Sequence, residues 1–249
     1  MNSPAPPLAV LDMDGTLFPG VLGTDLLAHL ARTGIADTHH ADAALAALQR
    51  YHEGRDPLTP AASAVYAHYA AALKDRHPAD VAGAAGEVWA AARERLFPFT
   101  RPLLSLLENA GFTCLLISGS PQEVVRLAAA DLGIAHALGT IADTHADRYT
   151  GTLSTALGLP GGKSGALRAL GVHPTARPNI AFAIGNSISD AEIFHQTAHP
   201  VAFEPDAELA TLARRHGWAT AHRHNLLETI DTTGLARHRA PHGQTPGDP

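Results

Sequence analysis

The sequence is poor in the features that mark disulfide-bonded, membrane and nucleic-acid-binding proteins. Its one cysteine, Cys114, cannot form an internal disulfide and is expected to be a small core residue. No apolar run is long enough to cross a bilayer and no signal-like segment is recognisable, which predicts a cytoplasmic protein without a membrane partner. The net charge is −6 and Lys and Arg form no cluster, which argues against a nucleic-acid partner.

Histidine is abundant, yet the sequence lacks the spacing of a transition-metal site. The 16 histidines include His39 beside His40, and His222 two positions before His224. Neither pair matches two histidines one helical turn apart with a catalytic glutamate. We expect most histidines to lie on the surface or in the C-terminal tail, and nothing in their pattern predicts zinc.

The order of apolar segments predicts an α/β fold. Short apolar strands alternate with helix-like segments, which is typical of a doubly wound parallel sheet with helices on both faces. Residues 18–98 differ, because they are rich in Ala and Leu at helical spacing and have little strand signal. We predict an α/β core from residues 1–17 and 99–232, a helical cap inserted after the first strand (18–98), and a disordered tail over 233–249.

Two carboxylates one residue apart end the first apolar run. Residues 8–11 read Leu-Ala-Val-Leu, and Asp12, Met13, Asp14, Gly15 and Thr16 follow. In open α/β sheets, ligands bind just outside the carboxyl ends of the strands. Asp-Gly also occurs in ordinary turns, so the pattern alone leaves a plain strand-ending turn open. The functional interpretation places Asp12 and Asp14 together in a cleft.

Three later segments strengthen the functional interpretation. A second apolar strand stops at Ser118 and Gly119, where glycine permits close backbone approach and the next helix offers its N-terminal amides to an anion. Lys163 opens a later helix-like segment, and a third apolar strand ends in Gly185, followed by Asn186 and Asp190.

The glycine-rich stretch before Lys163 must also be compared with a nucleotide-binding loop. That loop requires glycine six positions before the lysine. Position 157 is Leu, so we reject a nucleotide-binding loop.

These four ordered motifs, over roughly residues 8–220, resemble those of haloacid dehalogenase-superfamily phosphatases, most closely the phosphoserine-phosphatase-like branch. The resemblance implies the superfamily's Rossmann-like core and a helical cap at this position. It also implies that Asp12 is the nucleophile that forms an aspartyl-phosphate, and that Asp14 is the general acid and base. A dehalogenase would need no second acid, so the Asp-x-Asp pair favours a phosphate substrate.

The same resemblance implies roles for the other motif residues. Thr16, Ser118 and Gly119 would contact the phosphoryl oxygens, and Lys163 would balance their charge. Mg²⁺ would be held by the Asp12 carboxylate, the Asp14 backbone carbonyl and the Asn186 amide oxygen. Asp190 would orient Lys163 or a metal-bound water.

The sequence departs from the family pattern at two positions. Asn186 stands where the family usually has Asp, so Mg²⁺ would be held by less negative charge. Phosphoserine phosphatases bind the substrate ammonium with a glutamate nine residues after the nucleophile, and here that position is Val21. We therefore predict a Mg²⁺-dependent phosphatase for a small phosphorylated metabolite other than phosphoserine.

Two alternatives remain open from the sequence. One is a phosphotransferase that passes the same intermediate to an acceptor alcohol. The other is a protein that binds a phosphate ligand without turning it over, as the loss of charge at Asn186 would allow. The sequence sets no oligomeric state.

Overall fold

A computed structural model describes residues 6–171 and 180–232. It has one sheet of seven strands within these ranges, in the order β4-β3-β2-β1-β5-β6-β7. The strands are β1 (Leu8–Asp12), β2 (Thr113–Pro121), β3 (His136–His145), β4 (Arg148–Thr155), β5 (Ile180–Gly185), β6 (Thr197–Phe203) and β7 (Ala219–Ala221). All neighbours pair in parallel except β3 and β4, which form an antiparallel hairpin.

The chain reverses direction across the sheet at β1. It runs outward from β1 through β2 and β3 to β4, then returns to β5 on the other side of β1. Asp12 ends β1, and Gly185 ends the neighbouring β5. Such a switch point opens a crevice at the carboxyl ends of the strands. The fold itself therefore puts the first and last motifs side by side.

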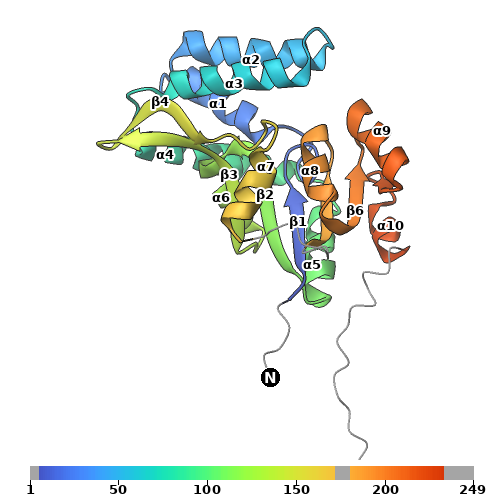
Figure 1. Cartoon of the computed structure of the whole chain (residues 1–249). Coiled ribbons are helices and arrows are strands. Elements are labelled where there is room, and N and C mark those ends of the chain that lie inside the picture. Colours follow the sequence, from blue (N-terminus) through green and yellow to red (C-terminus); the bar gives the residue numbers. More distant parts are fainter. Residues whose placement is uncertain (1–5, 172–179, 233–249) are drawn as a thin grey trace, which may run out of the picture.

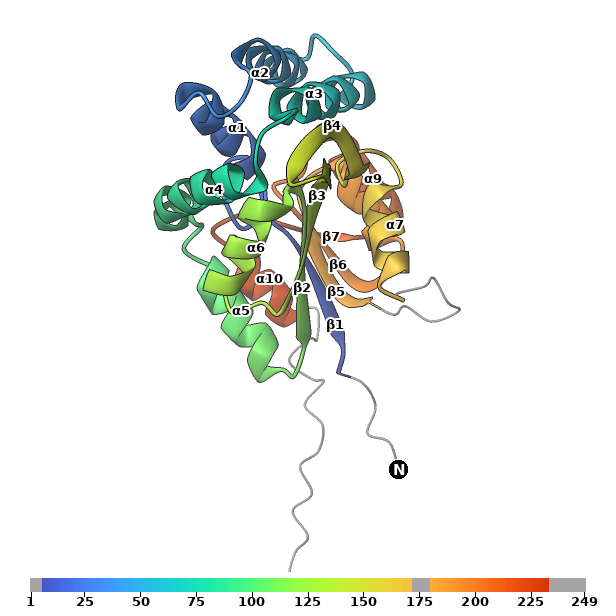
Figure 2. The same cartoon turned by 90° about the vertical axis from the view of Figure 1, so that its left-hand side faces the viewer.

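Helices cover both faces of this sheet, as predicted (Figures 1 and 2). They are α5 (Thr100–Asn109), α6 (Gln122–Asp131), α7 (Gly162–Ala169), α8 (Ala191–Phe194), α9 (Ala207–His216) and α10 (Leu226–Thr232). One apolar core joins β1 to α5, α6 and α10, and a second joins it to α7, α8 and α9. Alternate residues of β1 serve the two cores: Leu11 belongs to the first and Val10 to the second.

Four α-helices lie between β1 and α5, in the segment predicted as the cap. They are α1 (Leu22–Arg32), α2 (Thr38–His52), α3 (Leu58–Leu73) and α4 (Pro78–Ala92). Figure 2 shows α2 and α3 beyond the carboxyl edge of the sheet, while α4 lies beside α6. The α/β fold class is confirmed. The exact domain boundaries stay a prediction.

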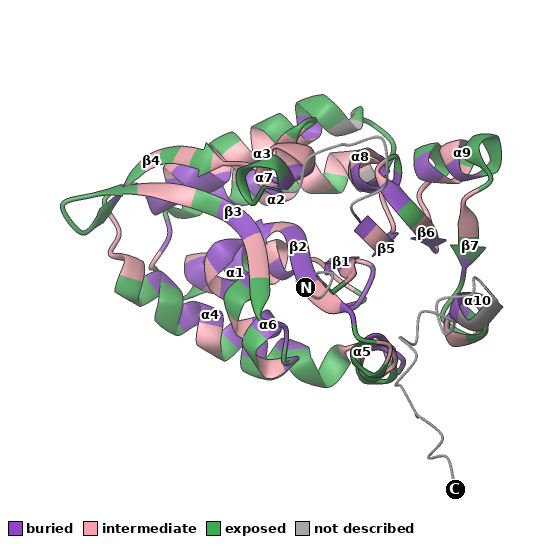
Figure 3. Ribbon diagram, turned by 60° about the horizontal axis from the view of Figure 1, so that its bottom comes forward, coloured by how far each residue is buried: buried purple, intermediate pink, exposed green. Residues whose placement is uncertain are grey.

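Sequence signals explain several helix boundaries. Asp37 precedes α2 and accepts a hydrogen bond from His40 N at 3.0 Å, and Pro78 opens α4 where its missing N–H costs nothing. Buried residues lie mainly on the strands and on the inward faces of the helices (Figure 3). None of the described helices is both long and apolar enough to cross a membrane.

The structure differs from the predicted elements in three places. Strand β2 runs on to Pro121, past the small residues that were expected to end it. The helix-like segment that the predicted alternation places after the third apolar strand is a short 3₁₀ turn followed by the four-residue α8. β7 and α10 were not predicted, because each is short and its apolar pattern is weak. The predicted tail, 233–249, lies outside the described residues.

Candidate active site

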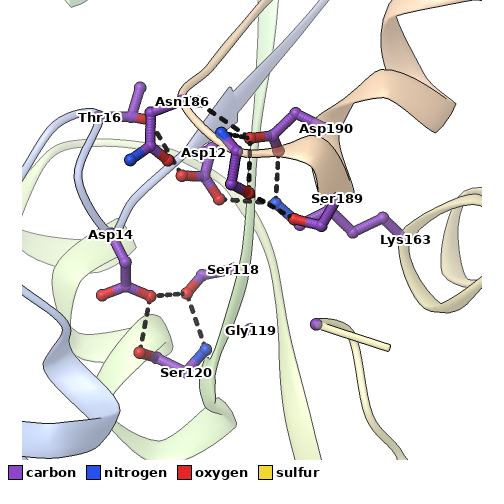
Figure 4. Close-up of polar contacts among 12 residues, drawn as sticks. Asp12, Asp14, Thr16, Ser118, Gly119, Ser120, Lys163, Asn186, Ser189 and Asp190 are labelled. Atoms are coloured by element: carbon purple, nitrogen blue, oxygen red, sulfur yellow. Dashed lines mark hydrogen bonds and ion pairs between the residues drawn. The ribbon is translucent and has the colours of Figure 1, made fainter. Parts of the chain in front are cut away.

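A buried lysine joins two of the predicted carboxylates. Lys163 Nζ, at the start of α7, lies 2.7 Å from Asp12 Oδ1 and 2.5 Å from Asp190 Oδ1. All three side chains are almost fully buried. Thr16 donates to the other Asp12 oxygen at 3.0 Å. Figure 4 shows these groups meeting from β1, α7 and the loop after β5.

Asp190 is held on both of its oxygens. Its Oδ2 accepts the backbone N–H groups of Asn186 and Ser187, each at 3.0 Å. Its Oδ1 is the oxygen that contacts Lys163. Asp190 therefore ties the lysine to the loop after β5 and fixes the ammonium group beside Asp12.

Asp14 lies in a separate hydrogen-bonding environment. Its Oδ2 accepts from Ser118 at 2.6 Å and from Ser120 at 2.7 Å, and its Oδ1 accepts the Leu22 N–H at 2.7 Å. Gly23 N in turn donates to Ser120 Oγ at 2.7 Å. Because Leu22 and Gly23 begin α1, the first helix of the cap segment contacts this carboxylate directly.

Burial and neighbouring charges shift the site's ionisation. Burial raises the pKa of Asp12 to about 7, and the Lys163 ammonium opposes that shift. Burial also raises the pKa of Asp14, while the hydroxyls of Ser118 and Ser120 oppose it. Burial alone would lower the pKa of Lys163, but Asp12 and Asp190 raise it above its ordinary value, so the amine stays charged.

Asn186 lies against the loop that carries Asp14. A Cβ placed on Gly15 would lie 2.1 Å from Asn186 Nδ2, and Gly15 has φ +76°, so two independent constraints favour glycine there. The backbone carbonyl of Asn186 accepts the Asp206 N–H at 2.8 Å. The amide of Asn186 is thus held beside the loop that links Asp12 and Asp14.

Oxygen donors near Asn186 fit a hard cation. A carboxylate offers about four acceptor positions, and the protein hydrogen bonds to Asp12 use two of them. Asp12, the Asp14 carbonyl and the Asn186 amide would form an all-oxygen set of the kind Mg²⁺ prefers. Among the described residues no three His, Cys, Asp or Glu side chains gather as a metal cluster, so such a site would depend on these mixed donors.

A tyrosine of α3 closes onto two glycines of the core. The Tyr66 hydroxyl donates to Gly119 O at 3.0 Å and accepts from Gly158 N at 2.9 Å. A Cβ on Gly158 would lie 2.3 Å from that hydroxyl. The close approach therefore requires glycine at 158, and the contact joins the cap segment to strand β2, which bears Ser118.

The structure brings together every residue predicted for the site. Asp12, Asp14, Thr16, Ser118, Gly119, Lys163, Asn186 and Asp190 all lie at the carboxyl edge of the sheet (Figure 4). The hydroxyls of Thr16 and Ser118 donate to carboxylates here, so each would have to turn its hydrogen to reach a phosphoryl oxygen. Their predicted contacts with phosphate stay a prediction.

Sequence reasoning missed three residues that shape the site. Ser120 binds Asp14, Tyr66 binds the two glycines, and Asp206 accepts from Ile188 N at 2.9 Å and so orders the Asn186 loop. Ser120 could have been suspected, since it follows Ser118 with the same chemistry. Nothing local to the sequence marks Tyr66, which lies among alanines.

Comparison with known proteins agrees with this geometry. The sequence profile described as haloacid dehalogenase-like hydrolase matches residues 9–195, which includes every predicted site residue. The chain belongs to this hydrolase family. The predicted resemblance and α/β architecture are therefore confirmed.

Two curated relatives of this chain are named as phosphatases. A phosphoserine phosphatase of Mycobacterium tuberculosis is 31% identical over 125 residues, which is 50% of this chain and 41% of that protein. A histidinol-phosphatase of Neisseria meningitidis is 30% identical over 128 residues, 49% of this chain and 56% of that protein. The chain therefore spans about half the length of the curated relatives it matches.

A solved structure shares the fold of this hydrolase. A phosphoserine phosphatase trapped as a phospho-aspartyl intermediate analogue superposes with a TM-score of 0.62 at 17% identity. The match covers 92% of this chain and 98% of that one, so the cap segment and the core both have counterparts there.

Lys163→Met tests how far the buried ion pairs support the fold. The change leaves Asp12 and Asp190 buried without their cation, and we expect the free energy of unfolding to fall by about 3–5 kcal/mol. Urea denaturation measures it. Lys74, the only other lysine, is exposed, so Lys74→Met is the matched control and should change little. Equal effects from both variants would contradict a structural role for the ion pairs.

Tyr66→Phe tests the contact between the cap segment and the core. It removes the hydroxyl from Gly119 O and Gly158 N, so the free energy of unfolding should fall by about 1–3 kcal/mol. Tyr69→Phe is the control, because the buried Tyr69 hydroxyl has no hydrogen-bond partner among the described residues. That variant should be as stable as the parent or more so. A loss as large in Tyr69→Phe would refute the assignment.

Proposed function

We propose that this protein is a Mg²⁺-dependent phosphatase that hydrolyses a small phosphate monoester through an aspartyl-phosphate on Asp12. The observation that carries the proposal is that two neighbouring carboxylates have different surroundings. Asp12 faces a buried ammonium group, while Asp14 faces two serine hydroxyls and a helix N-terminus. Two carboxylates in different environments can serve as nucleophile and as acid. The two relatives named as phosphatases support the same reaction class.

In the first half-reaction an Asp12 oxygen attacks phosphorus in line with the leaving oxygen. The bond from Asp12 to phosphorus forms, the ester P–O bond breaks, and Asp14 gives its proton to the leaving alkoxide. Burial raises the pKa of Asp14, which favours the protonated form that this step needs. Lys163 has three N–H donors and uses two for Asp12 and Asp190, so the third is left for a phosphoryl oxygen.

In the second half-reaction Asp14 acts as the base. It takes a proton from water, the water oxygen forms a bond to phosphorus, and the bond from phosphorus to Asp12 breaks. Phosphate leaves, and Asp12 returns as a carboxylate beside Lys163. Asp14 regains the proton that it gave away, so the cycle is balanced.

Asp12, the Asp14 carbonyl and Asn186 would hold the metal ion. Mg²⁺ bound there would supply positive charge that shields the attacking carboxylate from the phosphoryl oxygens. Asn186 adds no negative charge, unlike a carboxylate at the same position. We therefore propose a site that binds Mg²⁺ more weakly than one with an aspartate at 186.

Asp12→Asn should abolish turnover while leaving the fold intact, because an amide is too weak a nucleophile to form the intermediate. We expect phosphate release to fall by a factor on the order of 10³ or more. The measurement is phosphate release from a panel of monoesters with and without Mg²⁺. Asp42→Asn, at an exposed position of α2, is the control and should retain activity.

Product analysis in the same assay separates hydrolysis from transfer. If the phosphoryl group appears on added glycerol or nucleoside, and free phosphate does not form, the activity is that of a phosphotransferase and not of a phosphatase. Full activity in Asp12→Asn would contradict the aspartyl-phosphate mechanism. Mass spectrometry of acid-quenched parent protein should detect one added phosphoryl group.

Asn186→Asp tests the metal site. A further negative charge should lower the Mg²⁺ concentration for half-maximal activity by about tenfold. Asn109→Asp adds the same charge at an exposed position of α5 and should leave the titration unchanged. If the two variants titrate alike, Asn186 is not a ligand.

A further inference from the structure

A cavity leads from the two carboxylates into the cap segment. Its volume is about 390 Å³, within the range of small-molecule sites, and Asp12 and Asp14 lie in its wall. The cap side of the wall is formed by apolar and aromatic side chains of α1, α2 and α3. They include Leu27, Leu45, Leu48, Ala62, Val65 and Tyr69. An ester whose phosphorus lies at Asp12 would place its alcohol body among these side chains.

The cavity has no cation to spare for an anionic substrate body. Of the described residues that line it, Lys163 is the only Lys, Arg or His, and it already contacts two carboxylates. The other charged lining residues are Asp12, Asp14 and Asp206. A substrate carboxylate would lose water without gaining a partner, beside groups of the same charge.

Beyond the reaction centre, the described residues of the cavity wall offer a substrate ammonium group a single carboxylate. Asp206 is the one carboxylate in the wall beyond the reaction centre, and its oxygens accept from Ile188 N and Leu209 N. The cavity wall at Val21, at the start of the cap segment, is an apolar side chain. The walls therefore select against a carboxylate-bearing body, and beyond the reaction centre their described residues hold one carboxylate and otherwise uncharged side chains.

We propose that the substrate is the phosphate monoester of an alcohol with an uncharged hydrocarbon or aromatic body, and that carboxylate-bearing alcohols are excluded. The inference rests on the proposed phosphatase function and assigns its substrate class. Apolar contact with the cap helices favours binding of an uncharged body. A carboxylate-bearing alcohol binds poorly because the described cavity wall offers its carboxylate no counter-ion.

Three esters of primary alcohols test the proposal, because they share the reacting centre and differ in the body. Ethyl phosphate has almost no body, 2-phenylethyl phosphate has an apolar one, and O-phosphoserine has a charged one. With the Mg²⁺-loaded full chain, kcat/KM for 2-phenylethyl phosphate should exceed that for O-phosphoserine by about 100-fold, with ethyl phosphate between them. O-phosphoserine equal to or better than 2-phenylethyl phosphate would overturn the proposal.

Oxygen exchange between ¹⁸O-labelled phosphate and water tests the proposed reaction apart from the proposed substrate class, because exchange needs Asp12 and Asp14 but no alcohol. Exchange together with poor hydrolysis of 2-phenylethyl phosphate refutes the substrate class alone. Absence of both exchange and hydrolysis refutes the proposed function. Exchange with the expected ranking supports both.

Leu48→Asn places a polar amide in the apolar wall at nearly unchanged size. It should lower kcat/KM for 2-phenylethyl phosphate about tenfold and leave the value for ethyl phosphate less affected. Val65→Thr makes the same test with a closer match of shape. Leu170→Asn, at a leucine that is 52% exposed and outside this cavity, is the matched control. A tenfold loss for 2-phenylethyl phosphate in the control, or an unchanged kcat/KM for that ester in both wall variants, would contradict the assignment.

Discussion

The contact of Lys163 with Asp12 and Asp190 is the constraint on which the rest of the site depends. The lysine is 151 positions from Asp12 and 27 from Asp190, and the three groups are buried at the junction of three elements. Charges removed from water must be paired, so β1, α7 and the loop after β5 have little freedom to move apart. The sheet order makes the meeting possible, because β1 and β5 are neighbours.

The elements that were predicted from the sequence are those with a strong local signal. The strand at 8–12 is a continuous apolar run, and α4 repeats its buried residues at helical spacing, so each could be predicted alone. β7 has three residues, too few for a period to show. The extension of β2 to Pro121 depends on a register shift against β3, which no local pattern encodes.

The site divides in the same way. The resemblance to a family made the residues in ordered motifs predictable, namely Asp12, Ser118, Lys163 and Asp190. Ser120 and Tyr66 act through partners about 50 to 100 positions away, Asp14 for the first and Gly119 for the second. Their roles follow from the packing of the cap segment on the core, and one sequence without its fold gives no access to that packing.

The N-terminus of α1 contacts Asp14 and Ser120 through its backbone N–H groups and is also the start of the cap helices. Leu22 N holds Asp14, and Gly23 N holds Ser120, which itself holds Asp14. The hydrogen bond from Leu22 N lowers the pKa of Asp14, so a displacement of α1 from the core would raise that pKa. The position of the first cap helix and the ionisation of Asp14 are therefore coupled through the same hydrogen bonds, although the helix lies outside the sheet that carries the carboxylate.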